Sequence, residues 1–156
     1  MTTEKKTEGS TIVVGIDGSE HGNEALRWAA AEAELRSAKL VVAQAWSPTF
    51  GVMASPAGAI PADVWSSEDK RDATKNEMKK EVAAVLGDDP AVPVTIAAHQ
   101  GNPADVLIST AENVGADLLV VGSRGRGGFK RLLLGSVGEQ CATHAHCPVV
   151  IIRPIT

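Results

Sequence analysis

Five short apolar runs alternate along the chain with longer segments in which apolar residues recur at helical spacing. Each run is rich in Val, Ile, Leu and Ala, and a glycine, a proline or a polar turn follows it, as is typical of buried strands. We expect strands at residues 11–16, 40–46, 92–99, 117–121 and 148–152. The runs are apolar throughout rather than alternating, which indicates a sheet that is covered on both faces.

Four segments between these runs have the pattern of helices. Ser19 is suited to cap the first helix, whose apolar face is Leu26, Ala29, Ala30 and Ala33. The second helix is expected at residues 63–86. In the third, Asn102-Pro103 places a capping residue before a proline in the first turn. The fourth is expected at residues 136–145.

Strands that alternate with helices predict an α/β fold, a single-domain, doubly wound, parallel five-stranded sheet with helices on both faces. The length of 156 residues suits one domain. We expect the domain to occupy residues 11–156, with residues 1–10 as a polar, disordered tail and residues 47–61 as a long loop. In such sheets ligands bind beyond the carboxyl ends of the strands, where the winding reverses.

Composition narrows the classes of function. The formal net charge is -4 and aromatic residues make up 3% of the chain, which disfavours nucleic-acid binding. No apolar run is long enough to span a membrane and the first ten residues contain no apolar signal region, so we expect a cytoplasmic protein. Two cysteines do not form a disulfide framework.

The segment 122–136, GSRGRGGFKRLLLGS, contains the candidate binding chemistry. It follows a buried strand and leads into a helix, so glycine backbone N–H groups and the helix N-terminus can surround a phosphate. The Walker pattern is absent, and G-x-G-x-x-G fails because Lys130 stands at the third glycine position. A kinase or an ordinary dinucleotide-binding fold is therefore disfavoured.

The spacing Gly122-x2-Gly125-x9-Gly135-Ser136 resembles the nucleotide loop of ATP-binding universal stress proteins. The opening VVGIDGS at 13–19, the GNP at 101–103 and the CPVV at 147–150 resemble the same family, so the resemblance covers residues 11–153. It implies an adenine nucleotide alpha hydrolase-like fold, ATP bound between the first and fourth strands, often with Mg²⁺, and a regulatory role in stress response with an unidentified partner protein. Family members usually dimerise.

The resemblance also implies roles for individual residues. Gly15, Ile16 and Asp17 would lie beside the adenosine, while Ala45 and Val121 would line the adenine pocket. Ala45 is smaller than the branched residue common at this position, which could loosen selectivity for adenine. The ribose and phosphates would be held by the loop and the helix start: Gly122, Ser123, Arg124, Gly125, Arg126, Gly127, Gly128, Gly135, Ser136 and Val137.

Several of these residues have a structural interpretation as well. Ser136-x-x-Glu139 has the pattern of a capping box, which needs no ligand. Asp17 could order the turn before the first helix. His21 and His99 have no partner nearby in the sequence and are interpreted as structural.

Other functions remain open at this point. The loop contains Ser123 and Ser136 but no carboxylate or histidine as general base, so at most slow ATP hydrolysis or autophosphorylation is expected. A cyclic AMP or other adenylate binder is a further alternative. A zinc site at Cys141, His144, His146 and Cys147 is disfavoured by its cramped spacing. The apolar last strand would lie at a sheet edge, which favours a homodimer joined through it.

Overall fold

The computed structural model describes residues 9–47, 54–55, 58–59, 66–125 and 134–154. The main strands are β1 (Thr11–Gly15), β2 (Lys39–Trp46), β5 (Val94–Gln100), β6 (Leu118–Gly122) and β7 (Val149–Ile152). The helices are α1 (Glu20–Arg36), α2 (Ser67–Leu86), α3 (Pro103–Val114) and α4 (Ser136–His144). Each predicted strand and helix is therefore present, within one or two residues of the expected bounds except at the start of α2.

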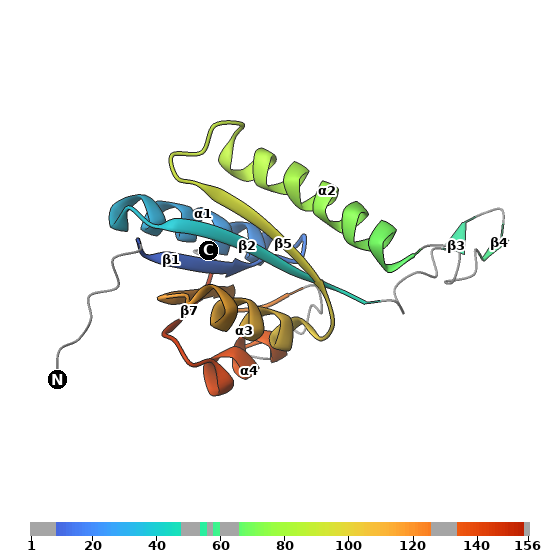
Figure 1. Ribbon diagram of the computed structural model, residues 1–156. Helices are drawn as coiled ribbons and strands as arrows, with labels where there is room; N and C mark the ends of the chain where they lie inside the picture. The colour runs from blue at the N-terminus through green and yellow to red at the C-terminus, as the bar shows by residue number, and fades with distance from the viewer. Residues whose placement is uncertain (1–8, 48–53, 56–57, 60–65, 126–133, 155–156) are drawn as a thin grey trace.

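The five main strands form one parallel sheet in the order β5-β2-β1-β6-β7. The chain winds outward from β1 through β2 to β5, then crosses to the other side of β1 and adds β6 and β7. The winding thus reverses between β1 and β6. Helices α1 and α2 cover one face and α3 and α4 cover the other (Figure 1). The predicted doubly wound α/β fold is confirmed.

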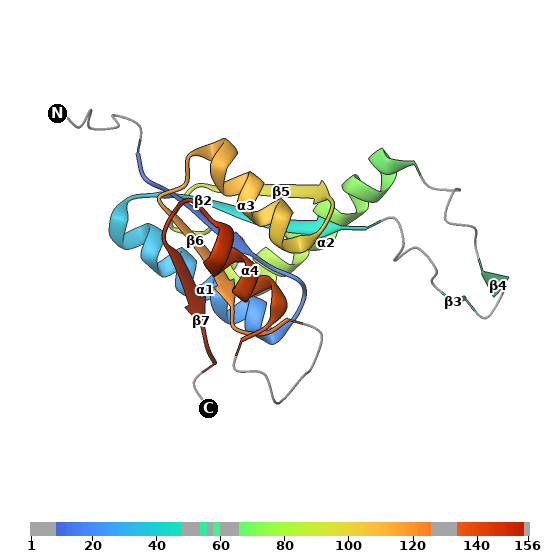
Figure 2. The same cartoon turned by 90° about the horizontal axis from the view of Figure 1, so that it is seen from below.

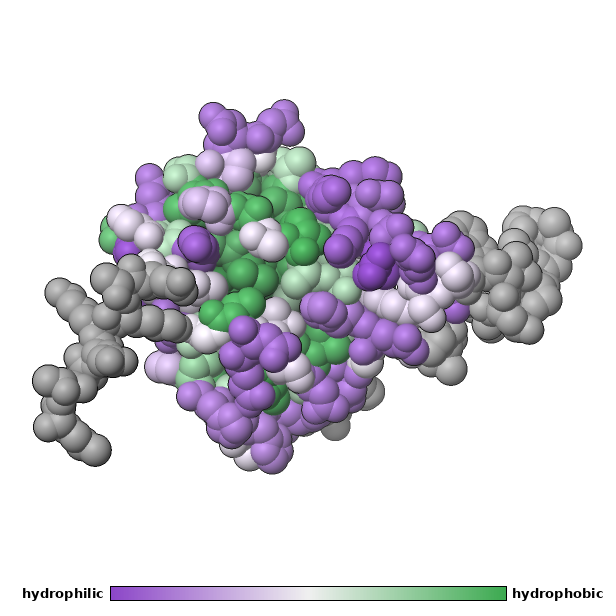
Figure 3. All heavy atoms as spheres, in the orientation of Figure 1, coloured by the Kyte–Doolittle hydropathy of each residue, from purple (hydrophilic) through white to green (hydrophobic). Residues whose placement is uncertain are grey.

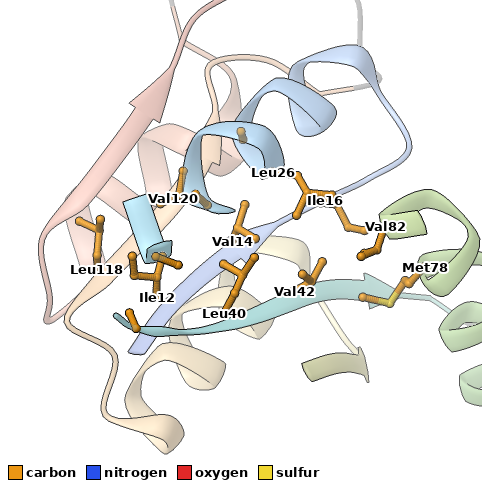
Figure 4. Close-up of a cluster of buried hydrophobic side chains, with 14 of the residues drawn as sticks. Ile12, Val14, Ile16, Leu26, Leu40, Val42, Met78, Val82, Leu118 and Val120 are labelled. Atoms are coloured by element: carbon orange, nitrogen blue, oxygen red, sulfur yellow. The ribbon is translucent and has the colours of Figure 1, made fainter. Parts of the chain in front are cut away.

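Each face of the sheet has its own apolar core. Alternate residues of the central strands, such as Val14, Val42 and Val120, pack under α1 and α2 together with Leu26 and Met78 (Figure 4). The residues between them pack under α3 and α4: Val13, Val41, Ala43, Leu119 and Val121. Because strand side chains alternate between faces, one continuous apolar run supplies both cores.

Capping residues fix where the helices begin. Ser19 and Asn102 cap α1 and α3 as predicted, with the side chains accepting hydrogen bonds from Gly22 and Ala104 N–H groups. The predicted start of α2 at residue 63 is wrong. Ser66 adopts the extended conformation of a cap and forms a reciprocal capping box with Asp69, so the helix begins one residue later, at Ser67.

The segment predicted as a loop at 47–61 contains a small element of regular structure. The strands β3 (Ala54–Ser55) and β4 (Gly58–Ala59) pair antiparallel and form a separate two-stranded sheet. The loop prediction is wrong for these four residues, because the pairing of two-residue strands does not need the apolar run that indicates the other strands. The predicted tail lies outside the described residues apart from Gly9 and Ser10.

The two outer strands of the sheet are β5 and β7. Figure 3 views the molecule from the β5 side, where hydrophobic side chains gather over the strands between α2 and α3. In Figure 2, β7 lies at the opposite edge, beside α4. The predicted edge position of the last strand is confirmed. Within the described parts of the chain, no helix combines the length and the apolar character that crossing a membrane requires.

Candidate functional site

The carboxyl ends of β1 and β6 lie side by side at the point where the winding reverses. Residues 12–14 of β1 pair with residues 118–120 of β6, so the segments that follow each strand leave the sheet as neighbours. One is Ile16-Asp17, whose position is fixed by a 3.0 Å hydrogen bond from the Ile16 N–H to the Ala43 carbonyl oxygen. The other is the glycine-rich segment from Gly122. Both predicted halves of the site therefore meet at one edge of the sheet.

Asp17 is held by the first turn of α1. Its Oδ1 atom accepts hydrogen bonds from the Ser19 N–H, at 3.0 Å, and from the Ser19 hydroxyl. The Ser19 hydroxyl oxygen in turn accepts from the Gly22 N–H at 3.1 Å. A Cβ atom on Gly22 would lie 3.0 Å from Asp17 Oδ1, so glycine at this position lets the helix turn approach the carboxylate. Asp17 thus orders this turn, and its Oδ2 atom faces the glycine-rich segment.

Gly125 is the residue of that segment that faces Asp17. A Cβ atom on Gly125 would lie 2.7 Å from Asp17 Oδ2, which is too close for any side chain. Gly125 is itself exposed, while Asp17 is half-buried. The Asp17 carboxylate and the loop backbone at Gly125 therefore lie so close together that only glycine fits at position 125.

Gly122 lies between the first turns of two helices. On one side, a Cβ atom would lie 2.8 Å from the His21 carbonyl oxygen and 3.1 Å from the His21 Cβ, in α1. On the other side, a Cβ built on Gly138, in α4, would lie 3.6 Å from the Gly122 carbonyl oxygen. The N-termini of α1 and α4 consequently converge on this point from opposite faces of the sheet, and the positive ends of both helix dipoles are near it.

Hydrogen bonds close the glycine-rich loop at its base. Ser123 is buried, and its N–H donates to the Ile152 carbonyl oxygen at 2.8 Å, which ties the loop to β7. Its own carbonyl oxygen accepts from the Gly135 N–H at 2.7 Å. The start and the end of the loop are therefore joined. Arg124 follows and is half-buried, and the predicted residues Arg126, Gly127 and Gly128 lie outside the described residues.

The N-terminus of α4 has no side chain as a cap. Gly135 is the N-cap residue, with no side-chain hydrogen bond, and Ser136 is the first residue of the helix. The interpretation of Ser136 as the capping residue of a capping box is therefore wrong. A Cβ on Gly135 would lie 3.3 Å from the Ser123 carbonyl oxygen and 3.4 Å from the Arg124 Cα, so a serine there would crowd the loop base. No cap side chain competes with an anion for the first N–H groups of α4, from Ser136 and Val137 onward.

The remaining predicted residues lie on β1, β2 and β6. A Cβ on Gly15 would lie 2.6 Å from Leu107 Cδ1, so the absence of a side chain at position 15 leaves room for Leu107 of α3 to pack in the core. The side chain of Val121 is buried in the core under α3 and α4, so any contact of Val121 with a ligand would be made by its backbone. Ala45 is half-buried near the end of β2, where it pairs in register with His99 of β5.

The two cysteines lie away from this edge, in the core under α3 and α4. Burial, and then the nearby Cys147 thiol, raise the pKa of Cys141 from 9.0 to about 11. Burial, followed by Asp117, also raises the pKa of Cys147. Both shifts favour the neutral thiol over the thiolate. In the described part of the chain, no three His, Cys, Asp or Glu residues are grouped as metal ligands.

Comparison with known proteins identifies the family of this chain. The model of the universal stress protein family matches residues 10–153. This chain belongs to the universal stress protein family. A family member from Thermus aquaticus is 32% identical over 143 residues, covering 92% of this chain and 98% of the relative. A member from Mycobacterium tuberculosis is 37% identical over 146 residues, covering 91% of this chain but only 47% of the relative. The chain thus spans about half the length of the mycobacterial protein.

Solved structures of the family share the fold. A universal stress protein in complex with cAMP is 29% identical, with a TM-score of 0.64, and the match covers 93% of this chain and 97% of that one. Universal stress protein UspA from Lactobacillus plantarum has a TM-score of 0.73 at 23% identity, covering 94% of this chain and 99% of that one. The family and the fold that the sequence resemblance implied are both confirmed.

Sequence reasoning missed two residues at this edge. Gly22 lies in the first turn of α1. A glycine at this position is visible in the sequence, but the sequence does not show that it contacts Asp17. His21 was interpreted as an isolated structural histidine, yet its backbone packs against Gly122, about a hundred residues later in the chain. The contact of His21 has no local sequence signal, because the sheet topology brings residues 21 and 122 together. The contact of Gly22 is local, within the turn that joins β1 to α1.

Proposed function

We propose that this chain is a regulatory universal stress protein that binds an adenine nucleotide, ATP in the first place, between the carboxyl ends of β1 and β6. The observation that carries the proposal is the meeting, at one sheet edge, of an ordered carboxylate, a glycine loop and an uncapped helix N-terminus. Asp17, Gly125 and Gly135 represent the three parts. Carboxylates accept hydrogen bonds from sugar hydroxyls, and helix N-termini bind phosphates, so the parts match the two ends of a nucleotide.

Charge decides the orientation of the nucleotide. Asp17 is the acidic side of the site and would repel phosphates, so the adenosine lies there, beside the backbone of Gly15 and Ile16. The phosphates lie at the start of α4, near the N–H groups of Ser136 and Val137, with Arg124 as a cation beside them. Adenine then extends along the edge toward the end of β2, where Ala45 lies.

Magnesium would be bound with the nucleotide rather than by the protein alone. Asp17 Oδ1 already accepts from Ser19, and the described residues contain no group of three metal ligands. Mg²⁺ commonly keeps several waters and binds through substrate phosphates. We therefore expect Mg²⁺ to strengthen the binding of ATP and to leave the binding of adenosine unchanged.

The experiment that tests the proposal is a calorimetric titration of protein freed of co-purified nucleotide. ATP with and without Mg²⁺ is compared with GTP, which has the same phosphates and a different base. Saturable binding of ATP that exceeds that of GTP supports an adenine site. Equal binding of both would leave only a phosphate site, and binding of neither would refute the proposal.

Cyclic AMP is the alternative ligand, because a solved relative of 29% identity contains it. A 3′,5′-cyclic phosphate cannot extend to the start of α4 as a triphosphate chain can. The small Ala45 side chain leaves room for a shifted base. Competition separates the two ligands: if cyclic AMP displaces ATP at lower concentration than AMP does, the site is a cyclic-nucleotide site.

Nucleotide occupancy would be transmitted through a homodimer. The edge strand β7 exposes backbone groups that a second copy can pair with, and the Ser123 N–H joins the glycine loop directly to Ile152 at the end of that strand. A change in the loop on ligand binding therefore acts on the dimer edge, and through it on an unidentified partner protein. Slow hydrolysis, the enzymatic alternative, would appear as ADP release that depends on Asp17.

A further inference from the structure

His21 has a ring nitrogen with no partner at the edge where the nucleotide is proposed to bind. Its Nδ1 atom is buried and forms no hydrogen bond with any described residue. The residue as a whole is half-buried. A buried polar atom without a partner costs roughly 1–3 kcal/mol, so an atom that has no partner in the protein calls for one from outside it, a water or a ligand.

The backbone fixes where this ring stands. His21 follows directly on Glu20 in the first turn of α1, which Ser19 and Asp17 tie to the end of β1. Its Cβ would lie 3.1 Å from a Cβ on Gly122, the first glycine of the loop. The imidazole is therefore attached to a turn that contacts both halves of the site, the end of β1 and the glycine-rich loop.

We infer that Nδ1 of His21 forms a hydrogen bond with the sugar-phosphate part of the bound nucleotide. This inference rests on the proposed function and adds a residue to the site. An imidazole nitrogen can accept from a ribose hydroxyl or, when protonated, donate to a phosphate oxygen, and both groups pass between Asp17 and α4 in the proposed orientation. Nucleotide binding would then provide the partner that the folded chain lacks.

Two substitutions distinguish this role from simple packing. Asn places a polar atom at the same distance from Cα as Nδ1, whereas Gln places one at the distance of Nε2. We expect His21→Ala to weaken ATP binding about tenfold, the effect of one net hydrogen bond. His21→Asn should restore most of the affinity and His21→Gln should not. Thermal unfolding of each variant shows whether the fold has changed.

A spectroscopic readout tests the contact itself. In ¹⁵N-labelled protein, the Nδ1 resonance of His21, assigned by its absence in His21→Asn, should shift on addition of ATP. A shift with ATP but not adenosine assigns the bond to a phosphate, and a shift with both assigns it to the ribose. If wild-type protein binds ATP while His21→Ala binds equally well and the resonance does not move, the inference fails alone. If wild-type protein binds no nucleotide, the proposed function fails and the inference with it.

Discussion

Gly125 packs so closely on Asp17 that a Cβ atom at position 125 would lie 2.7 Å from the carboxylate Oδ2. Among the described residues other than its chain neighbours, the next atom, at 3.9 Å, is the Asp17 carboxyl carbon. A methyl group here therefore acts on one functional group, the carboxylate that we place beside the ribose. The contact links residues 17 and 125 across the point where the sheet reverses its winding.

Replacement of Gly125 by Ala should reduce nucleotide affinity while leaving the fold intact. The methyl group displaces either the carboxylate or the loop, so we expect ATP to bind at least about tenfold more weakly, the equivalent of one charged hydrogen bond. Gly125 is exposed, so the free energy of unfolding should change by less than about 1 kcal/mol. Calorimetric titration and thermal unfolding measure the two effects.

Gly9→Ala is the matched control for this substitution. Among the described residues, a Cβ on Gly9 would meet the Ser37 carbonyl oxygen at 3.9 Å, an ordinary contact distance, at the opposite end of β1. It should change neither affinity nor stability. If Gly125→Ala binds ATP as tightly as Gly9→Ala does, then Asp17 and the loop do not form the nucleotide site.

Replacement of Gly122 by Ala should act differently, through the fold. A Cβ there would lie 2.8 Å from the carbonyl oxygen and 3.0 Å from the carbonyl carbon of His21. These are backbone atoms of α1, which cannot rotate away, so the first helical turn must shift. We expect a loss of about 1–3 kcal/mol in the free energy of unfolding, together with weaker ATP binding. Denaturant unfolding that matches wild type would contradict this close contact.

The architecture could be predicted from the sequence because its signals are local. Apolar runs bounded by turns, Ser19 and Asn102 before helical segments, and the alternation of strands with helices each indicate one element. The parallel sheet and its switch point follow from that order by general rules. The strands β3 and β4 could not be predicted, because a two-residue strand is too short to give an apolar run in the sequence.

The candidate site could be predicted only in part. The glycine spacing indicated a loop for phosphates, but glycine spacing does not say what each Cα faces. Three glycines of the same motif have three neighbours: α1 backbone for Gly122, the Asp17 carboxylate for Gly125, and the loop base for Gly135. The error at Ser136 also concerns the backbone: the Gly135 N–H donates to the Ser123 carbonyl oxygen, and the Gly135 carbonyl oxygen accepts from Glu139, so the helix begins after Gly135.

A substitution in β7 tests the proposed homodimer without breaking the sheet. The carbonyl oxygens of Pro148 and Ile152 accept from β6, and in a parallel ladder alternate residues face opposite sides. The N–H of Ile151 therefore points away from β6, to the side on which a second copy would pair. Proline is tolerated on an edge strand where the N–H faces outward. We expect Ile151→Pro to be monomeric and folded, with Ile151→Val, which keeps the N–H, remaining dimeric.

Light scattering after size-exclusion chromatography measures the outcome. If the dimer forms through β7, the molar mass measured for Ile151→Pro should be half of that measured for the wild type. A dimeric Ile151→Pro protein would assign dimer formation to another surface, and a monomeric wild type would refute the homodimer.

Stability should fall at alkaline pH because of Cys141. Its pKa is raised from 9.0 to about 11, chiefly by burial, so between these values the unfolded thiol has released a proton that the folded thiol keeps. The folded state then binds more protons, and the free energy of unfolding decreases as pH rises. The contribution is complete below about pH 9 and lost by about pH 11, and it amounts to roughly 2 kcal/mol. Denaturant unfolding from pH 8 to 11 measures it.

Cys141→Ala supplies the control, because it removes the thiol whose pKa is raised and leaves the rest of the chain unchanged. The chain contains no tyrosine, so no phenol titrates in this window. The variant should be less stable at pH 8, through the atoms lost from the core, and should lose less stability than wild type as pH rises. Cys147→Ser tests the second cause, since removal of the neighbouring thiol should lower the pKa of Cys141 slightly and shift the decrease to lower pH. Parallel pH profiles for wild type and Cys141→Ala would show that the Cys141 thiol is not protonated more strongly in the folded state.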